Sequence, residues 1–270
     1  AVPELQAQMN RGKEDARKFF QVATTLIDAD TDPKLVNEIR YFLSWLYWEA
    51  GDYYRAAVLG EFLARRYPDL SSASSAAKIS MASYERLSNQ AIAAGKKQDN
   101  GVFEASQMAQ MAQLIVRRWP GTPDADTAFG VLVGYAIRTG NTDSAEKMLA
   151  QASERSRPRL ELLLGSALWN RYLELSQAGK NASTPEALAT LKTSATKYLQ
   201  SGLEAARKAS RFDDTTAMAS LYLIQALLND GNDAEAITRL EDSSFGPLAL
   251  IEKDEAIAAK LPYAIEVYKT

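Results

Sequence analysis

The stretch GDYYRA at residues 51–56 has two counterparts further along the chain, GNTDSA at 140–145 and GNDAEA at 231–236. In each, the glycine suits the left-handed backbone conformation that ends a helix abruptly. The Asp or Asn that follows can cap the next helix at once. Helices joined by so short a turn fold back on one another. We therefore predict a tight helical hairpin at each site and an array of such hairpins as the fold.

Two longer hairpins are predicted between these corners. Their polar loops, at residues 95–101 and 179–183, both begin with Gly-Lys after an alanine. Five hairpins that alternate short and long indicate a duplicated unit of roughly 90 residues. We expect a helix over residues 2–29 before them and short helices around Pro247 and Pro262 after them. No run of residues alternates between apolar and polar, so no sheet is predicted.

Local signals set several helix boundaries. Asp32-Pro33 predicts a helix start, because Asp caps a helix and Pro fits its first turn. Pro158 is expected to close the hairpin that turns at residue 140. Asn232 and Glu235 fit the spacing of a capping box. The helix after Pro33 carries an apolar stripe at helical spacing, formed by Leu35, Ile39, Phe42 and Leu46.

The composition excludes several kinds of site. The chain has no Cys and no His, which removes thiol nucleophiles, imidazole bases, disulfides and the usual zinc sites. The net charge is −3, from 31 basic and 34 acidic residues. This balance argues against nucleic acid as a partner. No apolar run approaches the roughly 20 residues of a membrane span.

Catalytic groups are also few. The paired carboxylates of Asp213-Asp214 and the serines at residues 71–75 lie at predicted helix starts, where such side chains commonly serve as caps. No glycine-rich phosphate loop is present. We therefore predict that the protein is not an enzyme and that it uses no cofactor and no metal.

At its corners the sequence resembles tetratricopeptide repeats. The best copy spans residues 36–68, and two weaker copies follow. The matching residues are Leu43, Tyr47, Gly51, Asp52, Tyr53, Ala56 and Pro68 in the first copy, Leu132, Ala145, Ala152 and Pro158 in the second, and Leu223, Leu227, Ala236 and Pro247 in the third. The chain departs from the family at Arg40, where an aromatic is usual, and in its long hairpins, which exceed the family's unit of about 34 residues.

This resemblance implies an all-α fold, a right-handed α-solenoid of about five hairpins that forms a single domain over residues 1–270. Segments 62–68 and 114–123 also resemble repeat endings of bacterial envelope proteins. That likeness favours a bacterial source and an extracytoplasmic, periplasmic location over a cytoplasmic one. The chain starts at Ala1 without Met, so we expect either a cleaved signal peptide or a piece of a longer protein.

One helix carries the candidate binding residues. In the family, first helices of the hairpins line a concave surface, and their outward residues touch partners. By that resemblance a pocket would include Glu38, Tyr41, Trp45, Trp48 and Glu49, with Arg138 facing the same groove. Further positions expected there are Asn170, Arg171, Gln225 and Asn229. The competing interpretation is that the aromatics pack as core on the N-terminal helix, through Phe19 and Phe20.

The sequence thus favours a non-enzymatic scaffold that binds another protein or an extended peptide on a rigid concave face. Two alternatives stay open. The protein could bind a small molecule or glycan at the Trp45 and Trp48 cluster, or it could be an accessory domain of a larger enzyme or transport complex.

Overall fold

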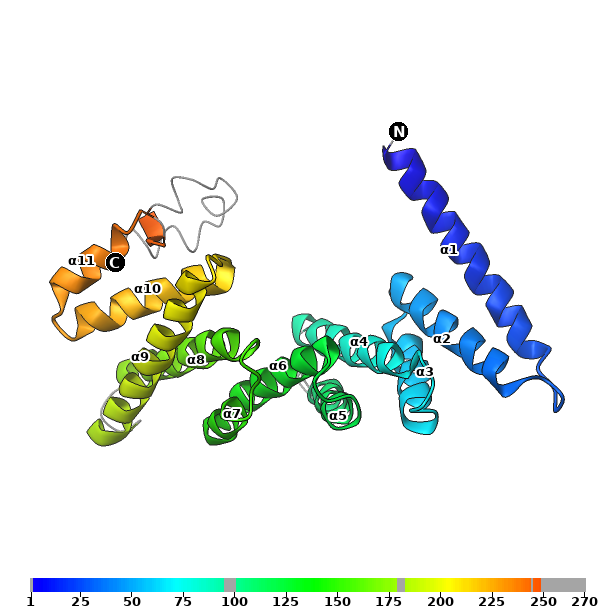
Figure 1. Cartoon of the computed structure of the whole chain (residues 1–270), viewed down its shortest axis with the longest axis horizontal. Helices are drawn as coiled ribbons and strands as arrows, with labels where there is room; N and C mark the ends of the chain where they lie inside the picture. Colours follow the sequence, from blue (N-terminus) through cyan, green and yellow to red (C-terminus); the bar gives the residue numbers. More distant parts are fainter. Residues whose placement is uncertain (1, 95–100, 179–182, 244, 249–270) are drawn as a thin grey trace. The chain divides into compact units, whose positions relative to one another are not determined.

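A computed structural model describes residues 2–94, 101–178, 183–243 and 245–248 of the chain. These residues form eleven α-helices and no strand, which confirms the all-α prediction for this part of the chain (Figure 1). The chain divides into two compact units, residues 1–135 and 136–270. The single repeat domain over 1–270 stays a prediction.

Unit 1 is a succession of helices, and from the first to the fifth each packs on the next. They are α1 (Val2–Thr25), α2 (Pro33–Glu49), α3 (Tyr53–Arg66), α4 (Ala73–Ala93), α5 (Val102–Arg118) and most of α6 (Pro123–Arg138). Contacts join α1 to α2, α2 to α3, α3 to α4 and α4 to α5, and α2 also touches α4. The second helix of the chain therefore has neighbours on more than one side.

Unit 2 repeats this pattern of neighbours. Its helices are α7 (Thr142–Leu149), α8 (Arg157–Gln177), α9 (Pro185–Lys208), α10 (Asp214–Asn229) and α11 (Asp233–Leu240). Each packs on the next, and α8 also touches α10. In both units, contacts between helices two apart accompany those between consecutive helices.

The predicted helix ends at the corner glycines are confirmed. Gly51, Gly140 and Gly231 have φ angles of 76°, 76° and 72°, in the left-handed region. At the first corner the Asp52 carboxylate accepts a hydrogen bond from the backbone N–H of Arg55 at 3.3 Å. At the second corner, the side-chain oxygen of Asn141 accepts a hydrogen bond from the backbone N–H of Ser144 at 3.1 Å. Each of these two corners therefore ends one helix and caps the next within two residues.

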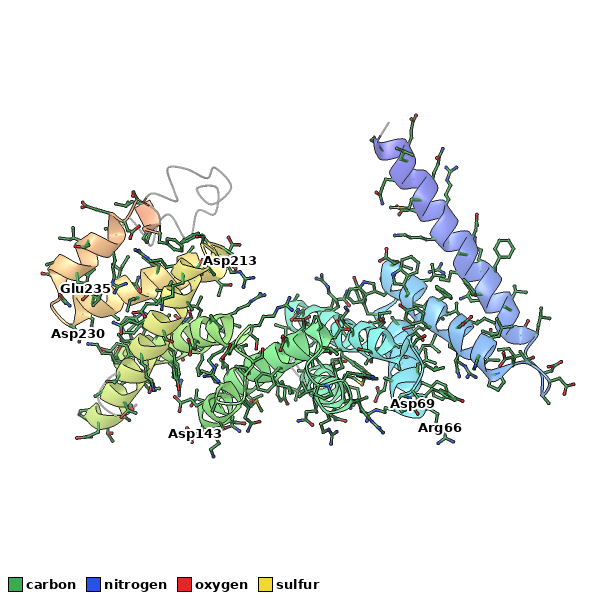
Figure 2. The ribbon with its side chains drawn as sticks, viewed as in Figure 1. Arg66, Asp69, Asp143, Asp213, Asp230 and Glu235 are labelled. Atoms are coloured by element: carbon green, nitrogen blue, oxygen red, sulfur yellow. The ribbon has the colours of Figure 1, made fainter. Side chains whose placement is uncertain are left out.

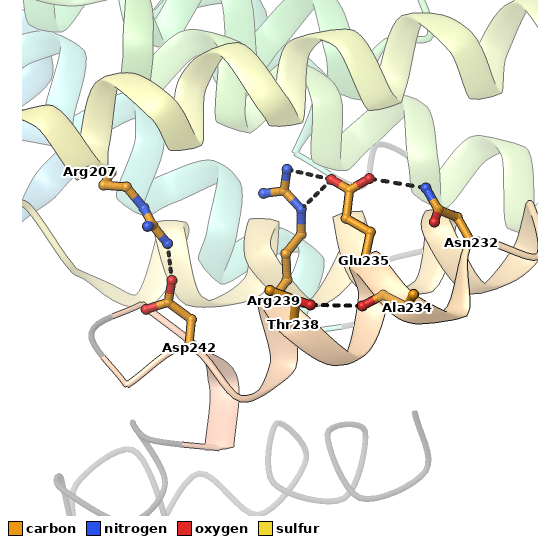
Figure 3. Close-up of polar contacts among 7 residues, drawn as sticks. All are labelled: Arg207, Asn232, Ala234, Glu235, Thr238, Arg239 and Asp242. Carbon is orange, nitrogen blue, oxygen red and sulfur yellow. Dashed lines mark hydrogen bonds and ion pairs between the residues drawn. The ribbon is translucent and has the colours of Figure 1, made fainter.

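The capping box predicted at the third corner is wrong. The side chain of Asn232 caps no backbone N–H. Its amide nitrogen instead donates to Glu235 at 3.0 Å, and Arg239 donates to the other oxygen of that carboxylate at 2.8 and 2.9 Å (Figure 3). The Glu235 carboxylate is therefore shared between the side chains of Asn232 and Arg239. A full capping box forms at Asp213 instead, with Thr216.

Two further boundaries differ from prediction. The first helix ends at Thr25 rather than near residue 29. There, the hydroxyls of Thr24 and Thr25 donate back to backbone carbonyls, and Asp28 then forms a turn with Thr31. Pro158 does not close a hairpin, because it lies in the first turn of α8, where proline fits. The expected helices near Pro247 and Pro262 fall largely outside the described residues.

Small residues let α3 and α4 approach closely. Ala56, Ala57 and Ala64 of α3 have no exposed surface. A Cβ atom added to Gly60 would lie only 2.5 Å from the carbonyl oxygen of Ala76 in α4. The crossing of these helices therefore requires glycine at position 60 for steric reasons.

A partly buried polar pair links the same two helices. The Tyr84 hydroxyl of α4 donates to the Glu61 carboxylate of α3 at 2.7 Å, and Arg65 donates to the other oxygen of that carboxylate, also at 2.7 Å. Burial raises the pKa of the Tyr84 phenol above its ordinary value, and the hydrogen bond to Glu61 raises it further. The phenol is thus held in its protonated form by the fold.

A matched pair of glycine substitutions tests the corner geometry. Gly140→Ala places a Cβ on a left-handed residue, so we expect the free energy of unfolding to fall by at least about 1 kcal/mol. Gly134→Ala makes the same chemical change inside α6, where the new Cβ meets nothing within 4 Å. We expect that variant to be neutral or stabilised by up to about 1 kcal/mol. Urea unfolding of both variants measures this, and equal midpoints would contradict the assigned corner.

The raised pKa of Tyr84 gives a stability change at high pH. Below the ordinary tyrosine pKa of about 10, the phenol is protonated in both states and its contribution is complete. Above it, the unfolded chain loses the proton first, so stability falls as pH rises toward the folded-state pKa. We expect Tyr84→Phe to lose stability less steeply than wild type above pH ~10. Urea unfolding of both proteins across this pH range measures the difference, and equal slopes would contradict the prediction.

Candidate functional site

The helix that carries the predicted aromatics is buried along one side and open along the other. Its buried side is formed by Val36, Ile39, Leu43, Ser44, Leu46 and Tyr47. Glu38, Tyr41, Trp45, Trp48 and Glu49, called the α2 face below, lie within about 100° of one another around the helix, because successive residues turn by roughly 100°. Three of them, Glu38, Trp45 and Glu49, are exposed, and Tyr41 and Trp48 are half-buried.

Two residues of the predicted stripe belong to the open side. Leu35 and Phe42 are exposed rather than buried, because α3 and α4 cover the opposite side of α2. The ring of Phe42 stacks on that of Phe20 in α1, with centroids 5.5 Å apart. The competing interpretation places the aromatics of the α2 face against Phe19 and Phe20. The ring that stacks on Phe20 is instead that of Phe42, and Phe19 is 75% exposed.

Trp45 lies beneath a lysine from the neighbouring helix. Its side chain is 38% exposed, and the Lys13 ammonium of α1 lies 5.7 Å from the ring centroid. The same ammonium forms an ion pair with Glu49, one turn further along α2. A cation shared between an aromatic ring and a carboxylate fixes both side chains. The indole of Trp45 is therefore held in place while more than a third of it faces solvent.

An open cleft of about 360 Å³ lies next to this cluster, between α1 and α2. Its walls carry acidic and basic side chains, one amide side chain, and the apolar surface of two α2 residues. The lining residues are Asn10, Lys13, Glu14 and Arg17 from α1 and Leu46, Glu49 and Ala50 from α2. Such a lining offers hydrogen-bond donors and acceptors to a polar or zwitterionic chain.

Trp48 packs inside the unit. Its ring lies 5.0 Å from that of Tyr53 at the start of α3, and it rests on the core cluster around Leu43 and Tyr47. The ring of Tyr41 lies next to that of Phe42, with centroids 5.5 Å apart. The two tryptophans of the α2 face therefore differ. Trp48 packs on the core of the unit, whereas the exposed part of Trp45 can contact a partner.

Arg138 is the last residue of α6 and is exposed. It belongs to unit 2, whereas the α2 face belongs to unit 1. Its place in one groove with the α2 face stays a prediction.

Two of the polar residues predicted for the second half of the chain hold helices together. Gln225 accepts a hydrogen bond from the indole N–H of buried Trp169 at 3.3 Å. Asn229 accepts from the Tyr172 hydroxyl at 3.0 Å and from the Lys192 ammonium at 2.7 Å. Together they tie α10 to α8 and α9. Arg171 pairs with Glu174 on its own helix, and Asn170 is exposed.

Sequence reasoning missed the basic groups beside Trp45. Lys13 and Arg17 lie four residues apart on α1, with Glu14 next to them. The spacing places both basic residues on one side of the helix, but the partner helix cannot be inferred from spacing alone. It also missed Lys192, which pairs with Asp230 across 38 residues at the end of α10, where Figure 2 labels the carboxylate.

No group of three acidic side chains suited to a metal ion occurs within the described ranges. Among those same residues, no helix combines the length and apolar character needed to cross a membrane. Comparisons of the chain with protein-family models, curated proteins and solved structures found no match.

The two tryptophans should respond differently to truncation. Trp48→Ala removes a ring that packs on the core, so we expect the free energy of unfolding to fall by at least about 2 kcal/mol. Trp45→Ala removes a partly exposed ring and one cation–π contact, so we expect a loss of about 1 kcal/mol or less. Chemical denaturation of both variants measures these values. An equal, large loss for both would show that Trp45 is core.

Proposed function

We propose that this protein is a non-enzymatic scaffold that binds a segment of another protein along the α2 face and the cleft beside it. The observation that carries the proposal is the state of Trp45, an indole fixed by Lys13 yet 38% exposed. Tryptophans of this kind are the side chains that most often dominate the energy of protein interfaces. Because the ring is already ordered, little side-chain entropy is lost when a partner covers it.

The proposed architecture is a tetratricopeptide-like, right-handed solenoid of five hairpins. Its support is the order of contacts within each unit, where consecutive helices pack and helices two apart, α2 with α4 and α8 with α10, also touch. In stacked helical hairpins, the first helices of successive hairpins meet in this way and form one continuous surface. The α2 face would then belong to that surface.

An extended peptide suits the cleft better than a compact ligand. Small-molecule sites are typically concave and mostly apolar, whereas five of the seven side chains lining this cleft are polar or charged. Lys13 and Arg17 supply hydrogen-bond donors to the cleft, and Glu14 and Glu49 supply acceptors. A peptide backbone with side chains of mixed charge can pair with both sets while an apolar residue covers Trp45.

The alternative of glycan binding rests on one observation. An exposed indole next to polar side chains, here Trp45 beside Glu49, can stack on a sugar ring while its neighbours bind hydroxyl groups. Titration with a panel of soluble oligosaccharides tests this alternative. Saturable binding that disappears in Trp45→Ala would support it over the peptide proposal.

Selection from a random peptide library displayed on phage tests the scaffold function. We expect the protein to enrich peptides that contain an apolar residue near charged ones. Their affinity should fall by at least about 30-fold for Trp45→Ala, the loss of a hot-spot residue. Phe103→Ala, which truncates an exposed aromatic of α5, is the matched control and should leave affinity unchanged. Failure to enrich any peptide, or peptides that bind Trp45→Ala as well as wild type, would contradict the proposal.

A further inference from the structure

The outer side of α1 carries a line of apolar side chains that the described chain leaves uncovered. Leu5, Gly12, Phe19 and Leu26 recur at intervals of seven residues, the last just beyond the helix end. Leu5, Phe19 and Leu26 are 65%, 75% and 73% exposed. An apolar interval of seven is typical of a helix that packs lengthwise on a second helix. Below, these four residues are called the α1 line.

The α1 line is separate from the side of α1 that meets α2. That side is defined by Lys13, which pairs with Glu49, by Phe20, which stacks on Phe42, and by Gln21, which donates to the Tyr47 hydroxyl at 2.9 Å. Exposed Met9 and Val22 flank the α1 line and widen its apolar surface. Within the part of the chain that the structure describes, the line therefore lacks a partner, although α1 already packs on α2.

No contact among the described residues requires glycine at position 12. It lies in the interior of α1, where glycine costs up to about 1 kcal/mol relative to alanine. A Cβ added there would meet no atom of the described residues within 4 Å. On the α1 line Gly12 leaves a gap seven residues before Phe19, which has the largest side chain of the line.

We propose that the α1 line pairs in antiparallel fashion with the α1 line of a second copy of this chain. With a two-fold axis between residues 15 and 16, Phe19 of one copy faces Gly12 of the other, and Leu5 faces Leu26. The phenylalanine ring then enters the gap that the glycine leaves. A parallel pair would set Phe19 against Phe19 and Gly12 against Gly12, which crowds one level and leaves a void at the next.

The basic residue next to Phe19 is paired within its own helix. Lys18 forms ion pairs with Glu14 at 3.0 Å and with Asp15 at 3.9 Å. Its charge therefore has acidic partners within each copy.

The uncovered surface is large enough to matter. The α1 line with Met9 and Val22 carries five large apolar side chains that are each between 47% and 75% exposed. Extended apolar patches on a protein surface often mark interaction sites. A specific interface covers roughly 800 Å² on each partner, and the stems of the flanking polar residues on α1 can supply the remainder.

Sedimentation equilibrium of the full chain tests the pairing, from micromolar to submillimolar concentration. We expect reversible dimers for wild type. Phe19→Ser and Gly12→Phe should each weaken dimerisation by at least about tenfold, the first by removing the ring and the second by filling its gap. Phe103→Ser changes an exposed phenylalanine on α5 and should leave dimerisation unchanged. Phe19 is exposed, so its variant should keep the wild-type circular dichroism spectrum.

Cysteine cross-linking tests the orientation, since the chain contains no cysteine of its own. In the antiparallel pair the two Leu5 positions lie about 30 Å apart at 1.5 Å per residue, so Leu5→Cys should not link to itself on oxidation. A mixture of Leu5→Cys with Leu26→Cys should link. A protein that stays monomeric at every concentration, a dimer that Phe19→Ser does not weaken, or self-linked Leu5→Cys would each overturn the proposal.

Discussion

The short joint between consecutive helices is the constraint on which unit 1 depends. At Gly51 a left-handed residue ends α2, and Asp52 caps α3 directly afterwards. With so little chain between them, the two helices pack against each other, and the close approach of α3 to α4 at Gly60 extends the layer. One side of α2 is thereby buried, and the residues on its other side face outward whatever their polarity.

The open side of α2 shows how one aromatic-rich helix serves both folding and contact. Trp48 leans toward Tyr53 and the core, so its apolar surface stabilises the unit. Trp45, one turn earlier, has Lys13 over its ring and is 38% exposed. The lysine is in turn held by Glu49, which keeps the charge paired while the indole stays accessible. Order without burial is the physical condition for a contact residue that binds at low entropic cost.

The two surfaces proposed here use different sides of α1. Lys13, which faces α2, and Phe19, at the centre of the outer line, lie roughly 120° apart around the helix at 100° per residue. A second copy docked on the α1 line therefore leaves the cleft beside Trp45 free. Binding of a partner segment and pairing of two copies can occur together, and two paired copies would present two α2 faces to one partner, which raises avidity when both engage.

The sequence by itself determined the helices, because their signals are local. A glycine that ends a helix, a side chain that caps the next one and a proline in a first turn each act within four residues. The heptad interval of the α1 line is also present in the sequence alone. The capping box expected at Asn232 does not form, and the Glu235 carboxylate pairs with the side chains of Asn232 and Arg239 instead.

Only the tertiary structure decided which side of each helix is buried and which polar groups meet. The apolar stripe of α2 extends over more than one side, so periodicity could not separate exposed Phe42 from buried Leu43. The contacts of Trp45 with Lys13, and of Asn229 with Lys192, join residues more than thirty positions apart. Such pairs depend on how whole helices pack, because short local patterns carry no information about the partner that a side chain meets across a helix interface.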